Sequence, residues 1–361
     1  MAYGTVNADV IGTSVSGSNL GAGNASIMKN RLINGAMVID QRNAGASVTG
    51  NDNVYGVDRF KVQVSQSSKF TMQQNAGSVT PPVGFVNYLG ITSSSAYSVG
   101  STDYFFLQQR IEGYNIADLN WGSANAKTIT LSFWVRSSLT GTFGGVLQND
   151  NQDRSYPFSY TISSANTWTQ ISVTIAGDTS GTWLTTNGMG IKVTWGLGVG
   201  STYSGTAGSW AGANYFSATG ATSVVGTSGA TFYITGVQLE VGSSATGYEY
   251  RQYGQELALC QRYYQAVNAG TLAYGRGNGT AGAVSNITTP VTMRATPSAP
   301  STSSGVLYSV AGYSGSVTVT WSSFYLQTNG INFQSTGFSG GTDNRPNMIE
   351  FGSGFYLSAE L

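Results

Sequence analysis

Apolar and polar residues alternate with a period of two in many stretches of this chain, and this alternation limits its possible folds most. Within residues 128–136, for example, Ile129, Leu131, Phe133 and Val135 share one side. Such a strand places one face in a core and the other toward polar surroundings. Further strand-like stretches are residues 60–64, 70–72, 104–111, 158–162, 168–175, 190–194 and 231–241. Only turn-rich segments separate them, which predicts an antiparallel jelly-roll sandwich of two sheets.

The composition agrees with an all-β protein whose surface carries few charges. Charged residues make up 9% of the chain, and its 49 glycines follow no collagen period. Hydroxyl and amide side chains take the place of ions, which is typical of β-rich extracellular or virion proteins. Disordered chains have the opposite signature, a high net charge.

The charge balance and the missing histidines exclude several classes of function. Sixteen Lys and Arg residues balance sixteen Asp and Glu residues without a basic run, so we expect no nucleic-acid partner. A chain without histidine lacks Ser-His-Asp and Cys-His machinery and the commonest metal ligand. Cys260 is the single cysteine, which leaves no intrachain disulfide or thiolate zinc site. We expect no cofactor and a buried, packing role for Cys260.

The N-terminal residues 1–29 are small, polar and glycine-rich, and they carry too few apolar side chains to make a core. We interpret them as an extended arm that docks on a partner; a frayed terminus is the alternative. The arm lacks a basic region followed by an apolar run, and no stretch has the apolar length of a membrane span. We therefore expect synthesis in a cytoplasm, release by a route such as lysis, and no membrane insertion.

Residues 30–60 are unusually dense in apolar and charged side chains. Ile33, Met37 and Ile39 predict a strand that begins near Gly35. Among the charged residues of the same segment are Asp40, Arg42, Asp58 and Arg59. We expect them to form an ion-pair cluster that closes one end of the sandwich. A catalytic pair of Asp40 and Asp58 is the alternative, although nothing in their spacing favours it.

Residues 247–265 give the one strong helix signal. Leu257, Cys260 and Tyr264 recur at helical spacing and make one apolar stripe. A helix this short does not hold in water alone, so a domain or a symmetry mate must cover the stripe. We expect three chains to meet along it as a short helical bundle on a trimer axis.

A second β region follows the helix and completes the predicted organisation. Its strand-like stretches are residues 284–291, 306–308, 317–321, 324–327, 331–333 and 355–358. The chain is thus predicted to divide into an arm (1–29), a jelly-roll (30–252), a linking helix (253–268) and a smaller C-terminal β-sandwich (269–361).

Several segments together resemble virion proteins of tailed phages. NRLINGAMVIDQRNAGASV and VYGVDRF resemble the opening of the β-sandwich modules in phage fibres; TITLSFWVRSSLTGTF, TWTQISVTIAGDTSGTW and ATFYITGVQLEVGSSATGYEYR resemble their body and last strand. This module is similar to jelly-roll carbohydrate-binding modules. GQELALCQRYYQ, VTMRATPSAP and FYLSAEL resemble the helix and domain that follow. Asp40, Asn43 and Phe60 depart from the pattern, which affects packing at one end of the sandwich. The resemblance covers residues 30–361 and implies a trimeric virion structural protein with glycan binding. We then expect residues 1–29 to attach the chain to other virion proteins, and the protein, made in a host cytoplasm and released by lysis, to be part of the virion.

Loop aromatics are the candidate glycan-binding residues, because the apolar face of a sugar stacks on aromatic rings. Trp183, Tyr203, Trp210 and Tyr215 lie in Gly/Ser/Thr-rich loops. Packing in a core or a subunit interface is nevertheless favoured over glycan binding for each of them, because aromatic residues dominate cores and interfaces. The remaining tryptophans adjoin strand patterns and are predicted to be core: Trp121, Trp134, Trp168, Trp195 and Trp321.

Calcium binding and glycan cleavage are two further possibilities, and the sequence favours them less than glycan binding. Asp150 and Asp153 gather oxygen ligands for calcium, but a polar hairpin tip explains them better. Paired carboxylates would make a glycan-degrading tailspike. No acidic pair sits in an aromatic-rich loop, and the chain has no β-helix repeat.

The sequence therefore predicts a phage tail fibre or receptor-binding protein that attaches to a host surface glycan or protein without catalysis. A capsid decoration or head-fibre protein is the main alternative, and a glycan-degrading tailspike is the weaker one.

Overall fold

The computed structural model describes residues 29–277, 282–298, 305–309, 318–336, 346–351 and 354–361. Apart from Lys29, the expected arm lies outside these residues. The chain divides after Arg251 into two compact units. Within the described residues, no helix combines the length and the apolar character that crossing a membrane requires.

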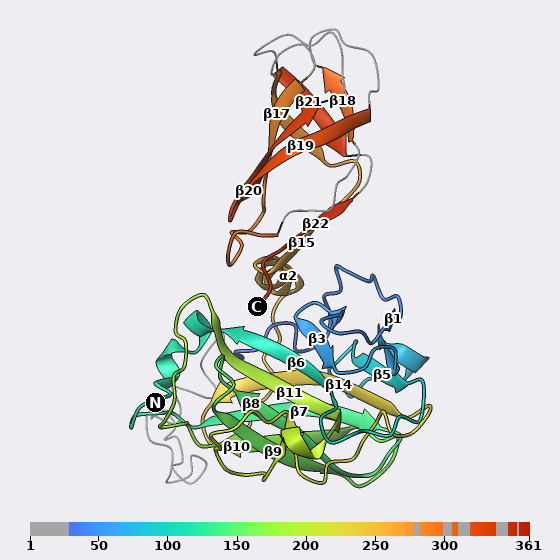
Figure 1. Cartoon of the computed structure of the whole chain (residues 1–361), viewed down its shortest axis with the longest axis vertical. Coiled ribbons are helices and arrows are strands. Elements are labelled where there is room, and N and C mark those ends of the chain that lie inside the picture. The colour runs from blue at the N-terminus through green and yellow to red at the C-terminus, as the bar shows by residue number, and fades with distance from the viewer. Residues whose placement is uncertain (1–28, 278–281, 299–304, 310–317, 337–345, 352–353) are drawn as a thin grey trace, which may run out of the picture. The chain divides into compact units, whose positions relative to one another are not determined.

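The first unit is a sandwich of two six-stranded antiparallel sheets, which confirms the jelly-roll prediction (Figure 1). The first sheet has the order β1 (Val48–Thr49), β4 (Phe70–Gln74), β5 (Leu89–Ser93), β14 (Thr231–Val241), β7 (Ile129–Ser137) and β10 (Thr169–Ile175). The second has the order β2 (Tyr55–Val57), β3 (Phe60–Val64), β6 (Tyr104–Glu112), β11 (Met189–Val199), β8 (Gly141–Gln148) and β9 (Ser155–Ile162).

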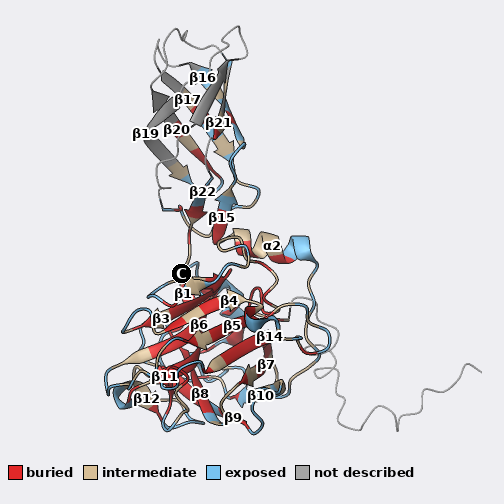
Figure 2. Cartoon of the chain, turned by 90° about the vertical axis from the view of Figure 1, so that its right-hand side faces the viewer, coloured by how far each residue is buried: buried red, intermediate tan, exposed pale blue. Residues whose placement is uncertain are grey.

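The apolar halves of the alternating strands form one core between the sheets. Leu131 and Phe133 of β7 are buried there, as are Leu107 of β6 and Trp195 of β11. Figure 2 shows buried residues running along the strands of both sheets. Each large apolar side chain buried in this way contributes about 1.5–3 kcal/mol. The predicted period of two thus assigns most core residues correctly.

The sequence did not predict a strand at β5 or at β8. β8 reads GTFGGVLQ, and its glycines lower the β propensity that would mark a strand. It is nevertheless paired along its whole length with β9.

The predicted strand near Gly35 is wrong, because Asn34 organises this segment as a turn. Asn34 has a left-handed backbone with φ 60°, as does Met37 with φ 57°. The Asn34 Nδ2 donates to the carbonyl oxygens of Ile39 (2.8 Å) and Asp58 (2.9 Å), and its Oδ1 accepts from the Ile39 N–H (2.9 Å). One buried amide therefore satisfies backbone groups that a strand would have paired with a neighbour.

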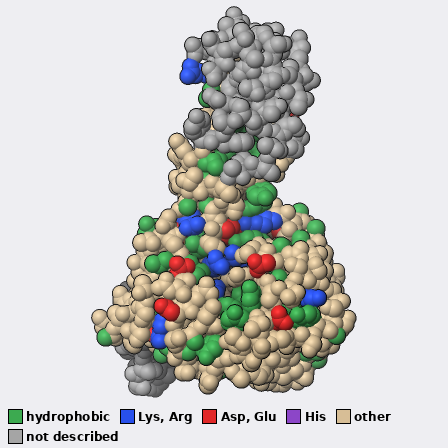
Figure 3. Space-filling view, viewed as in Figure 1, with side chains coloured by type: hydrophobic (Ala, Val, Ile, Leu, Met, Phe, Trp, Pro, Cys, Tyr) green, Lys and Arg blue, Asp and Glu red, His purple; other side chains and the backbone are tan. Residues whose placement is uncertain are grey.

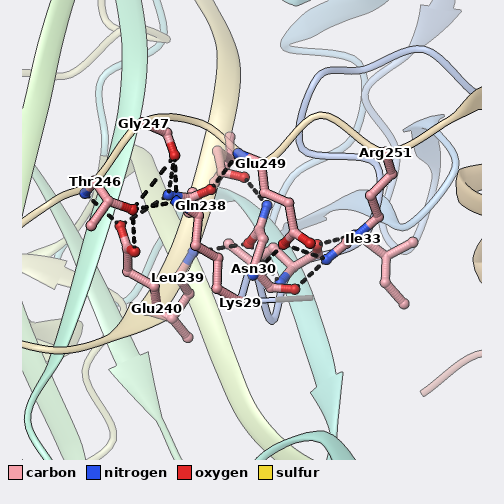
Figure 4. A network of polar contacts seen from close by, with 12 residues as sticks. Lys29, Asn30, Ile33, Gln238, Leu239, Glu240, Thr246, Gly247, Glu249 and Arg251 are labelled. Carbon is pink, nitrogen blue, oxygen red and sulfur yellow. Dashed lines mark hydrogen bonds and ion pairs between the residues drawn. The ribbon is translucent and has the colours of Figure 1, made fainter. Parts of the chain in front are cut away.

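The chain enters and leaves the first unit at one place (Figure 4). Lys29 donates to Thr246 Oγ1 and to the Gly247 carbonyl, and the Asn30 N–H donates to Glu249 (2.7 Å). Arg251 donates to the carbonyl oxygens of Asn30 and Leu32. We call residues 29–32 with residues 246–251 the clasp.

The second unit combines one helix, one ribbon and one barrel. Helix α2 (Tyr253–Gln261) precedes a ribbon of β15 (Tyr264–Val267) and β22 (Phe355–Ser358). The barrel is closed and has the order β16 (Leu272–Gly277), β17 (Gly282–Thr288), β20 (Gly330–Thr336), β19 (Thr318–Gln327), β18 (Gly305–Ser309) and β21 (Pro346–Phe351). The second region is therefore all-β as predicted, but it is a barrel and not a smaller sandwich.

The predicted apolar stripe of the helix is only partly helical. Helix α2 ends at Gln261, and Tyr264 belongs to β15, where its ring stacks on Tyr356 at 5.5 Å. Cys260 is 1% exposed, as expected, and Leu257 is half-buried. Tyr264 does not continue the helix, because β15 pairs with β22 from this residue on. Of the three residues expected at the trimer contact, only Leu257 and Cys260 therefore lie on the helix.

Candidate functional site

The predicted loop tryptophans are packing residues. Trp183 is only 7% exposed and meets Trp121 edge to face, with ring centroids 4.7 Å apart. Trp210 is half-buried and completes the group, 5.3 Å from Trp121 and 5.5 Å from Trp183. The expectation that these loop residues are exposed is wrong for Trp183. Gly/Ser/Thr-rich sequence indicated a loop correctly, but it could not show that the loop folds onto Trp121.

The indole N–H groups in this cluster are all bonded within the chain. Trp121 Nε1 donates to the Lys127 carbonyl (2.8 Å) and Trp183 Nε1 to the Ser180 carbonyl (3.1 Å). Trp210 Nε1 donates to the Ala176 carbonyl (2.8 Å). Edge-to-face rings with satisfied N–H groups stabilise loop structure and offer a sugar little open face.

Tyr203 lies elsewhere, on the outer face of the second sheet. Its ring stacks on Phe216 (4.9 Å, 27°) and meets Tyr104 of β6 edge to face at 5.7 Å. Phe216 in turn lies 4.7 Å from Phe106. The structure therefore separates the predicted residues, with Trp183 and Trp210 in one cluster and Tyr203 in another.

The loop of residues 200–222 is held flat against this outer face. Its short strands β12 (Ser204–Gly205) and β13 (Ser217–Ala218) pair in parallel, and the half-buried ring of Tyr215 lies against Gly205. Ser217 sits above Gly144 and Gly196, where an added Cβ would meet its Oγ at 2.6 Å. Side-chain-free positions on β8 and β11 thus let the loop approach the sheet closely.

The remainder of the outer face gathers positive charge. Lys192 of β11 is the register partner of Arg110 on β6 and of Gln148 on β8. Lys61 of β3 is the register partner of Gln108, two residues from Arg110 along β6. These residues alternate with core residues, so their side chains leave the sandwich on the outer side.

Lys192 is a buried cation without a carboxylate partner. It is 2% exposed, and its Nζ lies 5.0 Å from the ring centroid of Phe216 and 5.7 Å from that of Phe106. No hydrogen bond or ion pair joins its ammonium to any described residue. Burial, with repulsion from Arg110 and Lys61, lowers the pKa of Lys192 to about 7.

Other cations adjoin Lys192. Burial lowers the pKa of Arg110, and nearby Arg59, which donates to the Arg110 carbonyl (2.6 Å), adds to the effect. The Cζ of Arg42 lies 4.0 Å from the Tyr55 ring centroid, and the Lys61 Nζ lies 5.7 Å from it. We call the following five residues, drawn from a chain with sixteen Lys and Arg in all, the cation face: Arg42, Arg59, Lys61, Arg110 and Lys192.

Figure 3 looks onto this side of the first unit. It shows Lys and Arg side chains gathered near the middle, beside hydrophobic side chains and with acidic side chains to either side. Sequence reasoning missed this site, because its cations are scattered over residues 42–192. The available signal was a lysine at a polar position in the otherwise apolar strand pattern of residues 190–197.

Asp40 and Asp58, which the sequence offered as an alternative catalytic pair, stabilise the local backbone. Asp58 accepts from the backbone N–H and Nε2 of Gln41 and pairs with Arg42 at 3.2 Å. Asp40 accepts from the backbone N–H groups of Asn43 and Gly45. Each carboxylate therefore fixes the turn over residues 40–45. Arg42 and Asp58 form an ion pair as predicted, whereas Asp40 binds backbone N–H groups instead.

The weak calcium candidates lie at a hairpin tip. Asp150 is exposed between β8 and β9, and Asp153 accepts from Asn149 Nδ2 at 2.6 Å. The neighbouring Arg154 pairs with Asp178 at 2.7 Å. Over the described part of the chain, no three or more His, Cys, Asp or Glu side chains gather as a metal site would require.

Comparison with known proteins gives similarities of structure only. No family model and no curated protein matches the sequence. The structure is similar to the enzymatically active domain of tailspike protein 4 of bacteriophage CBA120, with 10% identity, a TM-score of 0.31 and coverage of 54% of this chain and 22% of that chain. A family 11 carbohydrate-binding module of Clostridium thermocellum, in complex with a mixed-linked tetrasaccharide, matches with 11% identity, a TM-score of 0.28 and coverage of 57% and 100%. The CBM22-1 xylan-binding domain from Paenibacillus barcinonensis matches with 7% identity, a TM-score of 0.26 and coverage of 56% and 99%. Likenesses this low carry no conclusion about the ligand of this chain.

Proposed function

We propose that this chain is a non-catalytic attachment protein of a tailed-phage particle, a tail fibre or receptor-binding protein that binds a glycan on the host surface. The observation that carries glycan binding is the outer face of the second sheet. There, buried polar and cationic side chains lie beside the aromatic rings of Tyr104, Tyr203 and Phe216. The aromatic rings can stack on the apolar face of a sugar, and the fixed hydrogen-bonding groups beside them can bind its hydroxyl groups.

The particle assignment comes from the resemblance of residues 30–361 to phage fibre modules and from the low-charge β composition. In this proposal, residues 1–29 attach the chain to other virion proteins. Three copies associate through helix α2, and the first unit faces the host.

Glycan binding is tested with the full chain on immobilised polysaccharides. The panel contains the surface polysaccharide of the host together with acidic and neutral polysaccharides, and binding is measured by biolayer interferometry. We expect Tyr203→Ala to weaken binding about 2- to 12-fold, which is the contribution of one aromatic contact. Tyr274→Ala, at an exposed tyrosine of the second unit, is the matched control and should leave binding unchanged.

Incubation of the full chain with the same polysaccharides tests the absence of catalysis. No new reducing ends should appear after long incubation of the chain with a polysaccharide that it binds. Released oligosaccharides would make it a tailspike enzyme.

The particle assignment needs its own measurement. Antibodies against the chain should label purified phage particles at the tail in electron micrographs. Label on the capsid would support the head-fibre alternative, and unlabelled particles would overturn the virion assignment.

A further inference from the structure

Two members of the cation face, Lys192 and Arg110, form no ion pair with any described residue. Arg42, by contrast, pairs with Asp58. Arg110 and Lys192 are register partners on neighbouring strands, where like charges repel each other. Both Arg110 and Lys61 disfavour the charged form of Lys192. The acidic group that favours it is Asp150, which is exposed at the hairpin tip and forms no ion pair with any described residue.

Lys192 also lacks the hydrogen bonds that a buried ammonium requires. Its three donors have only the rings of Phe106 and Phe216 as described electrostatic partners at close range. Burying a charge without a partner is costly, so such a group is kept where something else compensates it. A neutral sugar offers hydroxyl groups but no opposite charge.

Arg110 presents the geometry that anionic oxygens prefer. Its Nε donates to Gln108 Oε1 at 3.4 Å, and Gln108 Nε2 donates to Gln63 Oε1 at 3.0 Å. This chain of amides orients the guanidinium. The two terminal nitrogens of Arg110 make no hydrogen bond to described residues, so its fork remains open for a bidentate anion.

We infer that the glycan bound by the cation face is acidic, and that Lys192 and Arg110 receive its anionic group. This inference rests on the proposed function and adds the substrate class to it. The group is a carboxylate, phosphate or sulfate carried by a sugar. Nucleic acid fits less well, because the cations form a compact group in a chain of zero net charge rather than a basic stripe.

The test compares acidic polysaccharides with neutral counterparts of the same backbone. Polygalacturonate and hyaluronan are used native and after reduction of their carboxyl groups, dextran sulfate is paired with dextran, and poly(glycerol phosphate) represents phosphate. The host polysaccharide is included native and carboxyl-reduced. We expect binding to at least one acidic member, with about tenfold or greater loss for its neutral counterpart. The pair that shows this loss identifies the anionic group.

Matched variants separate the cation face from general electrostatic attraction. Lys192→Met and Arg110→Gln should each weaken binding to the acidic glycan about tenfold or more. Lys69→Met and Arg136→Gln remove cations that lie over Tyr97 and Tyr233, away from this face, and should leave binding unchanged. Circular dichroism confirms that each variant is folded. If the Lys69 and Lys192 variants lose binding equally, the attraction is unspecific and the inference is wrong.

The remaining outcomes distinguish the inference from the proposed function. Binding that is equal for native and neutral polysaccharides overturns the acidic ligand but leaves glycan attachment standing. Binding to no polysaccharide, the host polysaccharide included, overturns both.

Discussion

Removing the Lys192 charge should stabilise the protein. The pKa of Lys192 is lowered from 10.5 to about 7 by folding. Between these pH values the unfolded chain holds a proton that the folded chain has released, so the contribution of Lys192 to stability rises with pH. Below about pH 7 both states are protonated and the full penalty applies. Lys192→Met should therefore raise the free energy of unfolding at pH 6 by about 1–4 kcal/mol, and by less at pH 9.

Urea unfolding followed by tryptophan fluorescence measures this, because all tryptophans except Trp321 lie in the first unit. Lys69→Met is the control and should show little change at either pH. Lower stability of Lys192→Met than of the unmodified chain at pH 6 would contradict the prediction.

Lys192 also shows how far single residues could be predicted from the sequence. The alternation of residues 190–197 places it opposite the core residues, which is correct. The sequence could not show that Phe216, 24 positions later, covers it, because this depends on how the loop of residues 200–222 folds back. The exposure expected of Trp183 was wrong for the same reason, since it depends on a contact with Trp121.

Among the elements, long alternating strands were predicted well, whereas connections and glycine-rich strands were not. β6, β7 and β14 match their predictions within one or two residues. The segment after Gly35 failed because the amide of Asn34 competes with strand pairing, which an apolar pattern does not reveal. The helix was predicted too long because pairing of β15 with β22 overrides helical spacing at Tyr264.

The contact between the loop of residues 200–222 and the second sheet can be disturbed at Gly144. An added Cβ at Gly144 would come within 2.6 Å of Ser217 Oγ and 2.7 Å of the Ala218 backbone nitrogen. Gly144→Ala should displace β13, cost about 1–3 kcal/mol of stability and weaken glycan binding, because Phe216 and Tyr203 move with it. Hydrogen exchange should rise across residues 203–218.

Gly212→Ala is the control in the same loop, since its Cβ would meet nothing closer than the Asp153 carbonyl at 3.9 Å. It should leave exchange, stability and binding unchanged. Equal behaviour of the two variants would show that the loop is not seated through Gly144.

At the scale of the whole molecule, the sequence predicted two β regions and the break between them near the start of the helix. The structure divides the chain after Arg251, and α2 is part of the second unit. The closed barrel was beyond prediction, because strand closure depends on long-range pairings such as β16 with β21. The pattern of one strand does not specify a distant partner.

The proposed trimer can be tested on helix α2. Leu257 is half-buried within its own chain, so Leu257→Asp buries an unpaired charge if a second copy covers it. Light scattering after size exclusion should then show monomers in place of trimers. Gln255→Asp changes an exposed residue of the same helix and should leave the trimer intact. A trimer that survives Leu257→Asp must be held by other elements.

The clasp has a mechanical consequence. Because residues 29–32 are hydrogen-bonded to residues 246–251, a tether at the N-terminal side and a load at the C-terminal side pull on the same few bonds. Such a pull would load the clasp and β14 together, because Asn30 also donates to the Val237 carbonyl and accepts from the Leu239 N–H, each at 3.0 Å. Strand β14 belongs to the first sheet, whereas the proposed glycan-binding face lies on the second. A pull on the two ends of the first unit would therefore enter the sandwich through its first sheet.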